Sequence, residues 1–176
     1  MRLLDLLDPR RLPYALLRRF PPPPPLYWQL ARLANDSFLV GASGVIADED
    51  GRVLFFHHTY RRSPWGLPGG WMRRGESPLE TVEREVAEES GLEVRSTRLL
   101  LVGTAPDRAK LDFVVAGTVV GGSFRPSREV DAHRWCQPDE LPLAGFDRLV
   151  LAERAKLAPG EVGRFTTRWS TDDASG

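Results

Sequence analysis

The spacing of apolar positions predicts a folded domain over residues 37–157 with flanking segments of different character. Within that range, stretches rich in β-forming residues alternate with helical patterns and glycine-containing turns. The predicted strands are residues 38–47, 52–60, 98–104, 111–120 and 133–136. The first two, joined by the turn sequence of residues 48–51, are expected to pair as a hairpin. Because the elements lack the regular repeat of a doubly wound sheet, we expect a mixed sheet with helices packed on it.

Two helices are predicted in this domain, and the first has unusually clear ends. Ser77 is an N-cap, Pro78 takes the first helical position, Glu80 completes a capping box and Gly91 ends the helix at Ser90. The face expected to pack on the sheet carries Leu79, Val82, Val86 and Ser90. A second helix is expected over residues 146–157.

The segments outside the domain are predicted to be an extension and a tail. In residues 1–36, leucines recur at helical spacing on both sides of Pro21–Pro25, which we expect to form a stiff polyproline rod. These short apolar segments are expected to dock on the domain or on a second subunit; a membrane-surface helix and disorder are the alternatives. Residues 158–176 are mainly polar and are expected to be a frayed tail.

Composition restricts the class of partner and the compartment. The chain has 24 Lys and Arg residues and 24 Asp and Glu residues, so no net charge favours DNA. The single cysteine, Cys136, excludes an internal disulfide and favours a reducing compartment. Neither a secretory signal nor a membrane span is evident, and we expect a cytoplasmic protein without integral membrane association.

Three glutamates on the first domain helix suggest metal chemistry. Glu85, Glu88 and Glu89 are spaced by three and four residues, which puts their carboxylates in one patch. Such a patch is often only a solvated acidic face. If it is partly buried, however, a hard divalent cation such as Mg²⁺ or Mn²⁺ would relieve the repulsion.

The residues around this patch resemble the Nudix box, G-x5-E-x7-R-E-V-x-E-E-x-G-L. The matching positions are Gly70, Glu76, Arg84, Glu85, Val86, Glu88, Glu89, Gly91 and Leu92. Trp135 and the Pro-Asp-Glu-Leu-Pro sequence at residues 138–142 resemble the closing strand and loop of many members, so the resemblance covers residues 38–157. It implies an α/β fold, a Nudix-like α/β/α sandwich with a mixed central sheet.

The resemblance also implies the site residues. Glu85, Glu88 and Glu89 would bind Mg²⁺, with Mn²⁺ as a substitute, and the carbonyl of Gly70 would be a backbone ligand. Glu85 is the favoured general base, although members of the family differ in which residue accepts the proton.

Three further positions have supporting roles in this interpretation. Arg84 resembles the residue that orients a glutamate by ion pairing, and Glu76 supports the loop. Glu129 is the candidate for an additional acid outside the box, and its alternative is an ordinary surface glutamate.

Substrate contacts are expected from residues flanking the box loop. Arg61 and Arg73 are candidates to hold a phosphate, and Trp65 and Trp71 are candidates to stack on a base or, alternatively, to pack in the fold. The adjacent residues His57 and His58 lie on one strand, face opposite sides and cannot share a metal.

The function implied is hydrolysis of a phosphoric anhydride in a small nucleotide. The first hypothesis is a Mg²⁺-dependent pyrophosphohydrolase acting on a nucleoside diphosphate linked to another moiety, such as ADP-ribose or a nucleotide sugar. The alternatives are a nucleoside triphosphate, an oxidised nucleotide or a capped RNA end. A hypothesis of another class, a non-catalytic ligand-binding Nudix module, is disfavoured because no box glutamate is missing. The resemblance also implies a homodimer.

Overall fold

The computed structural model describes residue 19 and residues 22–167, which fall into two compact units divided between Phe38 and Leu39. In the first unit, helix α2 spans Pro24–Ala34. The helical spacing of its leucines is confirmed, but the polyproline rod is wrong for Pro24 and Pro25. Proline lacks an N–H and is tolerated in the first helical turn, where that group would have no partner in the helix. The predictions for residues 1–18, 20 and 21 lie outside the described residues.

The second unit is built on a five-stranded mixed sheet in the order β4-β1-β6-β5-β8. Its strands are β4 (Gly69–Trp71), β1 (Leu39–Ile46), β6 (Lys110–Gly122), β5 (Leu92–Ala105) and β8 (Gly163–Thr166). The pairs β1–β6 and β5–β8 are parallel, and β4–β1 and β6–β5 are antiparallel. The expected mixed sheet is therefore confirmed.

A smaller antiparallel sheet has the order β3-β2-β7, with β3 at Trp65–Gly66, β2 at Val53–His58 and β7 at Val130–Cys136. The predicted hairpin of the first two strands is wrong, because β1 and β2 lie in different sheets and are joined by a single bridge, Ala47 to Val53. The turn does form, with the amide of Gly51 donating to the carbonyl of Asp48. Beyond it the strands diverge, because β1 pairs along its whole length with β6.

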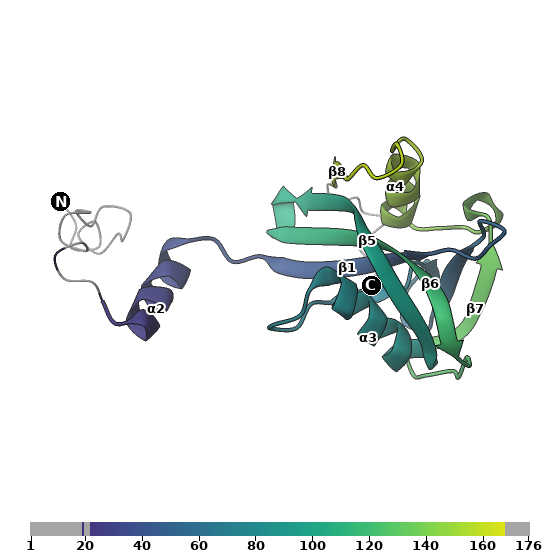
Figure 1. The fold of residues 1–176 in the computed structure, drawn as a ribbon, viewed down its shortest axis with the longest axis horizontal. Helices are drawn as coiled ribbons and strands as arrows, with labels where there is room; N and C mark the ends of the chain where they lie inside the picture. The colour runs from purple at the N-terminus through teal and green to yellow at the C-terminus, as the bar shows by residue number, and fades with distance from the viewer. Residues whose placement is uncertain (1–18, 20–21, 168–176) are drawn as a thin grey trace. The chain divides into compact units, whose positions relative to one another are not determined.

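Helices cover both sides of these sheets (Figure 1). Helix α3 (Pro78–Ser90) packs in one apolar cluster with Phe56, and α4 (Gly145–Arg154) packs in the other with Phe55. Adjacent residues of a strand point to opposite faces, so β2 contributes one phenylalanine to each cluster. The α/β/α arrangement implied by the family resemblance is confirmed.

Local signals for α3 are confirmed in detail. The side chain of Ser77 accepts a hydrogen bond from the amide of Glu80 at 3.3 Å, and the carboxylate of Glu80 accepts one from the amide of Ser77 at 2.8 Å. Gly91 ends the helix in the left-handed conformation at φ 71°. The helix also buries Glu89, which the apolar pattern did not predict.

The fraying predicted for residues 158–176 is wrong for residues 163–166. Residues 163–166 form β8, and the buried side chain of Phe165 packs directly on Gly103 of β5. This contact and the backbone pairing of β8 with β5 hold a segment whose average composition is polar. Residues 168–176 lie outside the described residues.

Two short 3-10 helices, Pro106–Arg108 and Pro138–Glu140, complete the unit. Among the described residues, no helix is long and apolar enough to cross a membrane.

Candidate active site

A cavity of about 580 Å³ opens beside the N-terminal half of β1, between β4, α3 and the start of α4. The carboxylates of Glu85, Glu89 and Glu129 border it, as do the cationic side chains of Arg61 and Lys110. Acidic groups that can hold a cation and basic groups that can hold an anion therefore share one cavity.

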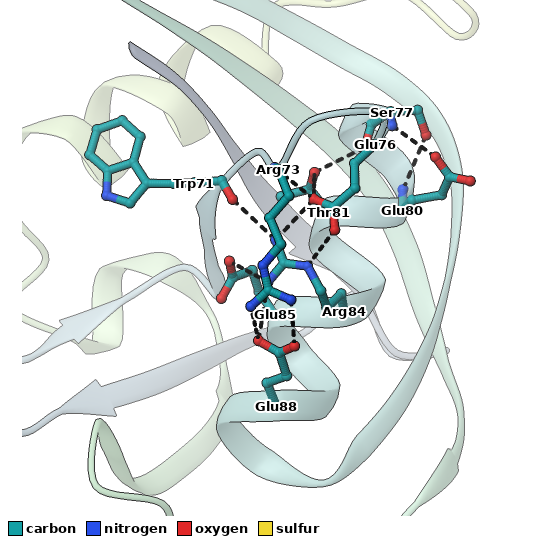
Figure 2. A network of polar contacts seen from close by, with 9 residues as sticks. All are labelled: Trp71, Arg73, Glu76, Ser77, Glu80, Thr81, Arg84, Glu85 and Glu88. Atoms are coloured by element: carbon teal, nitrogen blue, oxygen red, sulfur yellow. Dashed lines mark hydrogen bonds and ion pairs between the residues drawn. The ribbon is translucent and has the colours of Figure 1, made fainter.

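Arg84 ties the box loop to helix α3 (Figure 2). Its Nε and Nη2 donate to the two carboxylate oxygens of Glu76 at 2.6 and 3.0 Å, and its Nη1 donates to Glu85 at 2.7 Å. Nη2 also donates to the carbonyl of Trp71 at 3.1 Å. The hydrogen bonds from Arg84 lower the pKa of Glu76 to about 2. These are the contacts that the orienting role of Arg84 and the supporting role of Glu76 would require, and both roles stay predictions.

Glu85 lies directly against the backbone of Gly70. A Cβ atom at residue 70 would stand 2.5 Å from the carboxylate carbon of Glu85, so a larger residue there would displace this carboxylate. Gly70, whose backbone carbonyl is the implied ligand, therefore lies beside the carboxylate of Glu85 at the cavity wall. Gly70 and Glu85 are therefore next to each other, as the implied ligand set requires.

Glu89 is the most deeply buried acid of the patch, with 6% of its surface exposed. Burial, together with the charges of Glu85 and Glu129, raises the pKa of Glu89 to about 8. Its Oε2 atom is buried and has no hydrogen-bond partner in the described part of the chain. A buried carboxylate oxygen without a donor is unfavourable unless a cation or proton satisfies it.

Glu88 is not brought to the cavity. Its carboxylate, 48% exposed, accepts two hydrogen bonds from the guanidinium of Arg73, at 3.0 and 2.9 Å, and one from Arg84 at 3.1 Å. The hydrogen bonds from Arg73, which have the larger effect, and from Arg84 hold the pKa of Glu88 below its usual range. Within residues 22–167, no three His, Cys, Asp or Glu side chains already stand in metal-binding geometry. Of the predicted set, the structure assembles Gly70, Glu85, Glu89 and Glu129.

The four candidates for substrate contact separate into two pairs. Arg61 and Trp71 line the cavity, and Trp71 is 53% exposed. Arg73 is engaged with Glu88, and Trp65 packs its ring edge-on against His57 and joins the apolar cluster of α4. Of the two alternatives for Trp65, stacking on a base or packing in the fold, the structure shows packing in the fold.

The two adjacent histidines face opposite sides of β2, as predicted. His57 bonds to Asp131 at 2.6 Å near the surface, whereas His58 is fully buried.

Several cavity residues were not anticipated from the sequence. They are Tyr60, Lys110, Asp112, Phe146 and Asp147. Lys110 and Asp112 sit at alternate positions at the start of an apolar strand, so both point to one face. That pair of polar residues on a strand otherwise rich in valine was the available signal. Buried Asp147, which accepts a hydrogen bond from the amide of Leu67 at 3.3 Å, had no such signal.

Comparisons with known proteins agree with this arrangement. The NUDIX domain family model matches residues 37–156. An 8-oxo-dGDP phosphatase, NUDT18, from Danio rerio is 35% identical over 126 residues, which cover 68% of this chain and 38% of that protein. An ADP-ribose pyrophosphatase from Methanocaldococcus jannaschii is 29% identical over 114 residues, covering 61% of this chain and 67% of that protein. A NUDIX hydrolase from Nitrosomonas europaea has a similar fold, with a TM-score of 0.66 at 18% identity, over 77% of this chain and 81% of its own.

The matched segment contains the complete box and every carboxylate of the cavity wall. The chain spans less than half of the Danio rerio relative, so the similarity concerns the domain and not the whole of that protein. On the family match and the shared fold, this chain belongs to the Nudix hydrolase family.

Proposed function

We propose that this chain is a Mg²⁺-dependent pyrophosphohydrolase that cleaves the diphosphate joining a nucleoside to another moiety. The observation that carries the proposal is the cavity in which Glu85, Glu89 and Glu129 face Arg61. Carboxylates that gather a divalent cation, beside a guanidinium that can pair with a phosphate, are the groups that such a reaction requires.

The side chains present fit a divalent cation. Nudix hydrolases generally use such ions, typically Mg²⁺, and the unpartnered oxygen of Glu89 is a hard donor of the kind that Mg²⁺ prefers. We assign the ligand positions to Gly70, Glu85, Glu89 and Glu129, with Glu88 joining them on release from Arg73. A bound Mg²⁺ would neutralise phosphate oxygens and lower the pKa of a coordinated water.

Three side chains have further roles in the proposed reaction. Glu85 is the general base in this proposal, and its hydrogen bond to Arg84 fixes the direction of its carboxylate. Arg61 pairs with a phosphate oxygen that is not at the reacting bond. The exposed ring of Trp71 supplies a flat apolar surface at the cavity for the nucleoside.

Two substrate groups are supported by the named relatives. The name of the Methanocaldococcus jannaschii protein supports ADP-ribose and related linked diphosphates. The second candidate is an oxidised guanine nucleotide, because the more similar Danio rerio protein is named an 8-oxo-dGDP phosphatase. Both substrates contain a nucleoside diphosphate.

A substrate panel tests the proposed activity. The full chain would be incubated with Mg²⁺ and either ADP-ribose, nucleotide sugars, 8-oxo-dGDP or nucleoside triphosphates, and both products identified by chromatography. We expect cleavage between the phosphates of a diphosphate substrate, absent when EDTA replaces Mg²⁺. Binding of these nucleotides without any hydrolysis would instead support the non-catalytic module.

We also propose a cytoplasmic homodimer without a DNA partner. The balanced charge and single cysteine support the absence of DNA binding and the reducing compartment. The exposed apolar residues Leu26, Trp28 and Leu33 of α2 support association with another copy.

A further inference from the structure

The position of Glu129 depends on a turn that is fastened to the end of β2. Thr59, the first residue after β2, contacts this turn through its amide and its hydroxyl. The amide donates a hydrogen bond to the carbonyl of Glu129 at 2.9 Å, and the hydroxyl donates one to the carbonyl of Arg128 at 2.7 Å. The hydroxyl is also 3.4 Å from the carbonyl oxygen of Glu129. One residue therefore holds the carbonyl groups on both sides of the Glu129 Cα atom.

Ser127 fixes the same turn from within. Its hydroxyl oxygen accepts hydrogen bonds from the amides of Glu129 and Val130, at 3.2 and 3.0 Å, and its own amide donates to the carbonyl of Val130 at 2.7 Å. Serine side chains stabilise local turns in this way, by binding backbone groups a few residues along the chain. The peptide group between Arg128 and Glu129 is thus held at its nitrogen by Ser127 and at its oxygen by Thr59.

A β-bulge lies next to this turn. The register of β2 with β7 shifts by one residue between His57 and His58, and Asp131 is the extra residue of β7 at that step. The side chain of Asp131 returns to β2, because its Oδ1 lies 2.6 Å from His57 Nδ1. Bulges bend a strand and change the direction of the side chains beyond them, and they are frequent beside active sites.

The bulge decides which way the end of β7 faces. Val130 lies in the apolar cluster of α3, whereas Cys136, six residues further along the same strand, lies in the cluster of α4. In a regular strand, residues six positions apart face the same side. The extra residue has therefore inverted the alternation. Val130 is turned into the core, and its neighbour Glu129 borders the cavity.

Glu129 acts on the acids of helix α3 from this position. Besides burial and the charge of Glu85, the charge of Glu129 raises the pKa of Glu89 to about 8. Arg61, which also borders the cavity, follows Thr59 by two residues. A single short segment therefore presents the guanidinium and holds the turn that carries the acid outside the box.

We propose that Thr59 and Ser127 are positioning residues that hold the carboxylate of Glu129 toward the divalent cation in the cavity. The inference rests on the proposed function, in which Glu129 is one of the ligands. Neither hydroxyl contacts the cation or the substrate in this proposal. Their effect passes through the peptide group before Glu129, which they bind at both ends.

The test measures the affinity of the full chain for Mn²⁺ by titration calorimetry, which does not depend on hydrolysis. Thr59→Val keeps the branched shape and removes the hydroxyl. We expect the Kd for Mn²⁺ to rise by about two- to tenfold, the range for one lost hydrogen bond. Thr59→Ser restores the hydroxyl donor and should bring the Kd back to within about twofold of the unmodified chain.

A double-mutant cycle separates positioning from a general contribution to the fold. Glu129→Gln should itself raise the Kd for Mn²⁺, and adding Thr59→Val to it should then raise the Kd no further, since no carboxylate is left to position. A merely structural hydroxyl would weaken Mn²⁺ binding by the same factor with and without the Glu129 carboxylate. Ser127→Ala should follow the same pattern, and it provides the measurement if Thr59→Val does not fold.

Thr97 supplies the matched control. Its hydroxyl also donates to a backbone carbonyl, that of Ala116 at 3.3 Å, and it is exposed and does not border the cavity. Thr97→Val removes the same group from the same type of residue, and the Kd for Mn²⁺ should stay at the level of the unmodified chain.

The positioning role and the proposed activity fail in different ways. An unchanged Kd in Thr59→Val and Ser127→Ala, an unchanged Kd in Glu129→Gln, or equal losses with and without the Glu129 carboxylate would overturn the positioning role, whatever the chain hydrolyses. Affinity for Mn²⁺ that depends on Thr59 only while Glu129 is present, in a chain that cleaves none of the substrates in the panel, would support the positioning role and overturn the proposed activity.

Discussion

At the scale of single residues, three glutamates one helical turn apart have three different electrostatic environments. Glu85 accepts a hydrogen bond from Arg84, Glu88 is held by Arg73 outside the cavity, and Glu89 is buried without a partner for one oxygen. The pKa of Glu88 is lowered and that of Glu89 is raised to about 8. The spacing in the sequence predicts that these side chains are neighbours, but their different environments depend on residues outside the helix.

The raised pKa of Glu89 predicts a pH-dependent stability of the metal-free protein. In the folded chain this carboxyl keeps its proton up to about pH 8, whereas its ordinary pKa of 4.5 describes the unfolded chain. Between those values the folded state binds more protons, so the free energy of unfolding falls as pH rises. We expect the Tm in EDTA to decrease between about pH 5 and about pH 8.

Glu89→Gln should remove this part of the pH dependence, because glutamine stays neutral. The exposed residue Glu49 provides the control variant Glu49→Gln, which should keep the slope of the unmodified protein. Equal slopes for Glu89→Gln and the unmodified chain would show that Glu89 ionises normally in the folded state.

Glu85→Gln tests the general base. The substitution keeps the size of the side chain and removes its basicity, so we expect kcat to fall by about 10²- to 10⁴-fold. Circular dichroism should show an unchanged fold, and Glu49→Gln should retain activity. Near-normal kcat in Glu85→Gln would move the base to another acid, and Glu129→Gln would then be the variant to measure.

At the scale of elements, the box loop and α3 are joined by arginine–carboxylate pairs that would compete with the proposed metal binding. Arg73 holds both oxygens of Glu88 (Figure 2). We expect Arg73→Gln to free this carboxylate and to raise the affinity for Mn²⁺ by about two- to fivefold, as an exposed ion pair contributes roughly 0.2–1 kcal/mol. Titration calorimetry with Mn²⁺ measures this directly.

The neighbouring exposed residue Arg74 supplies the control for charge alone. Arg74→Gln removes the same charge from the loop, and Mn²⁺ affinity should stay at the level of the unmodified chain. A Kd for Mn²⁺ that is identical in both variants would mean that Glu88 takes no part in the site.

Elements whose ends are marked by nearby residues were predicted well from the sequence. The pairing of strands that lie far apart in the sequence was not. The helix at residues 78–90 has its cap, its proline and its terminal glycine within its own sequence, so its bounds followed directly. The pairing of β1 with β6 joins residues about 70 positions apart and depends on burial on both faces. For the same reason Lys110 and Asp112 were missed, because only that pairing brings them beside Trp71.

At the scale of the whole molecule, the extension is expected to support self-association. Helix α2 exposes Leu26, Tyr27, Trp28 and Leu33, the last of them at 83%. Deleting residues 1–34 should therefore reduce the mass in solution, measured by light scattering, from that of a dimer to that of a monomer. Affinity for Mn²⁺ should be unchanged, since the cavity residues all lie beyond the deletion. An unchanged mass would show that the extension is dispensable for assembly.

Strand β8 protects the outer side of the central sheet. It pairs with residues Leu101–Thr104 of β5, whose backbone N–H and C=O groups would otherwise point away from the sheet without partners. Such bare edges promote pairing between molecules and aggregation. A protein shortened to residue 156, where the family match stops, would keep every box glutamate and lose this protection. Its loss would first appear as precipitation on storage, before any change in the chemistry of the site.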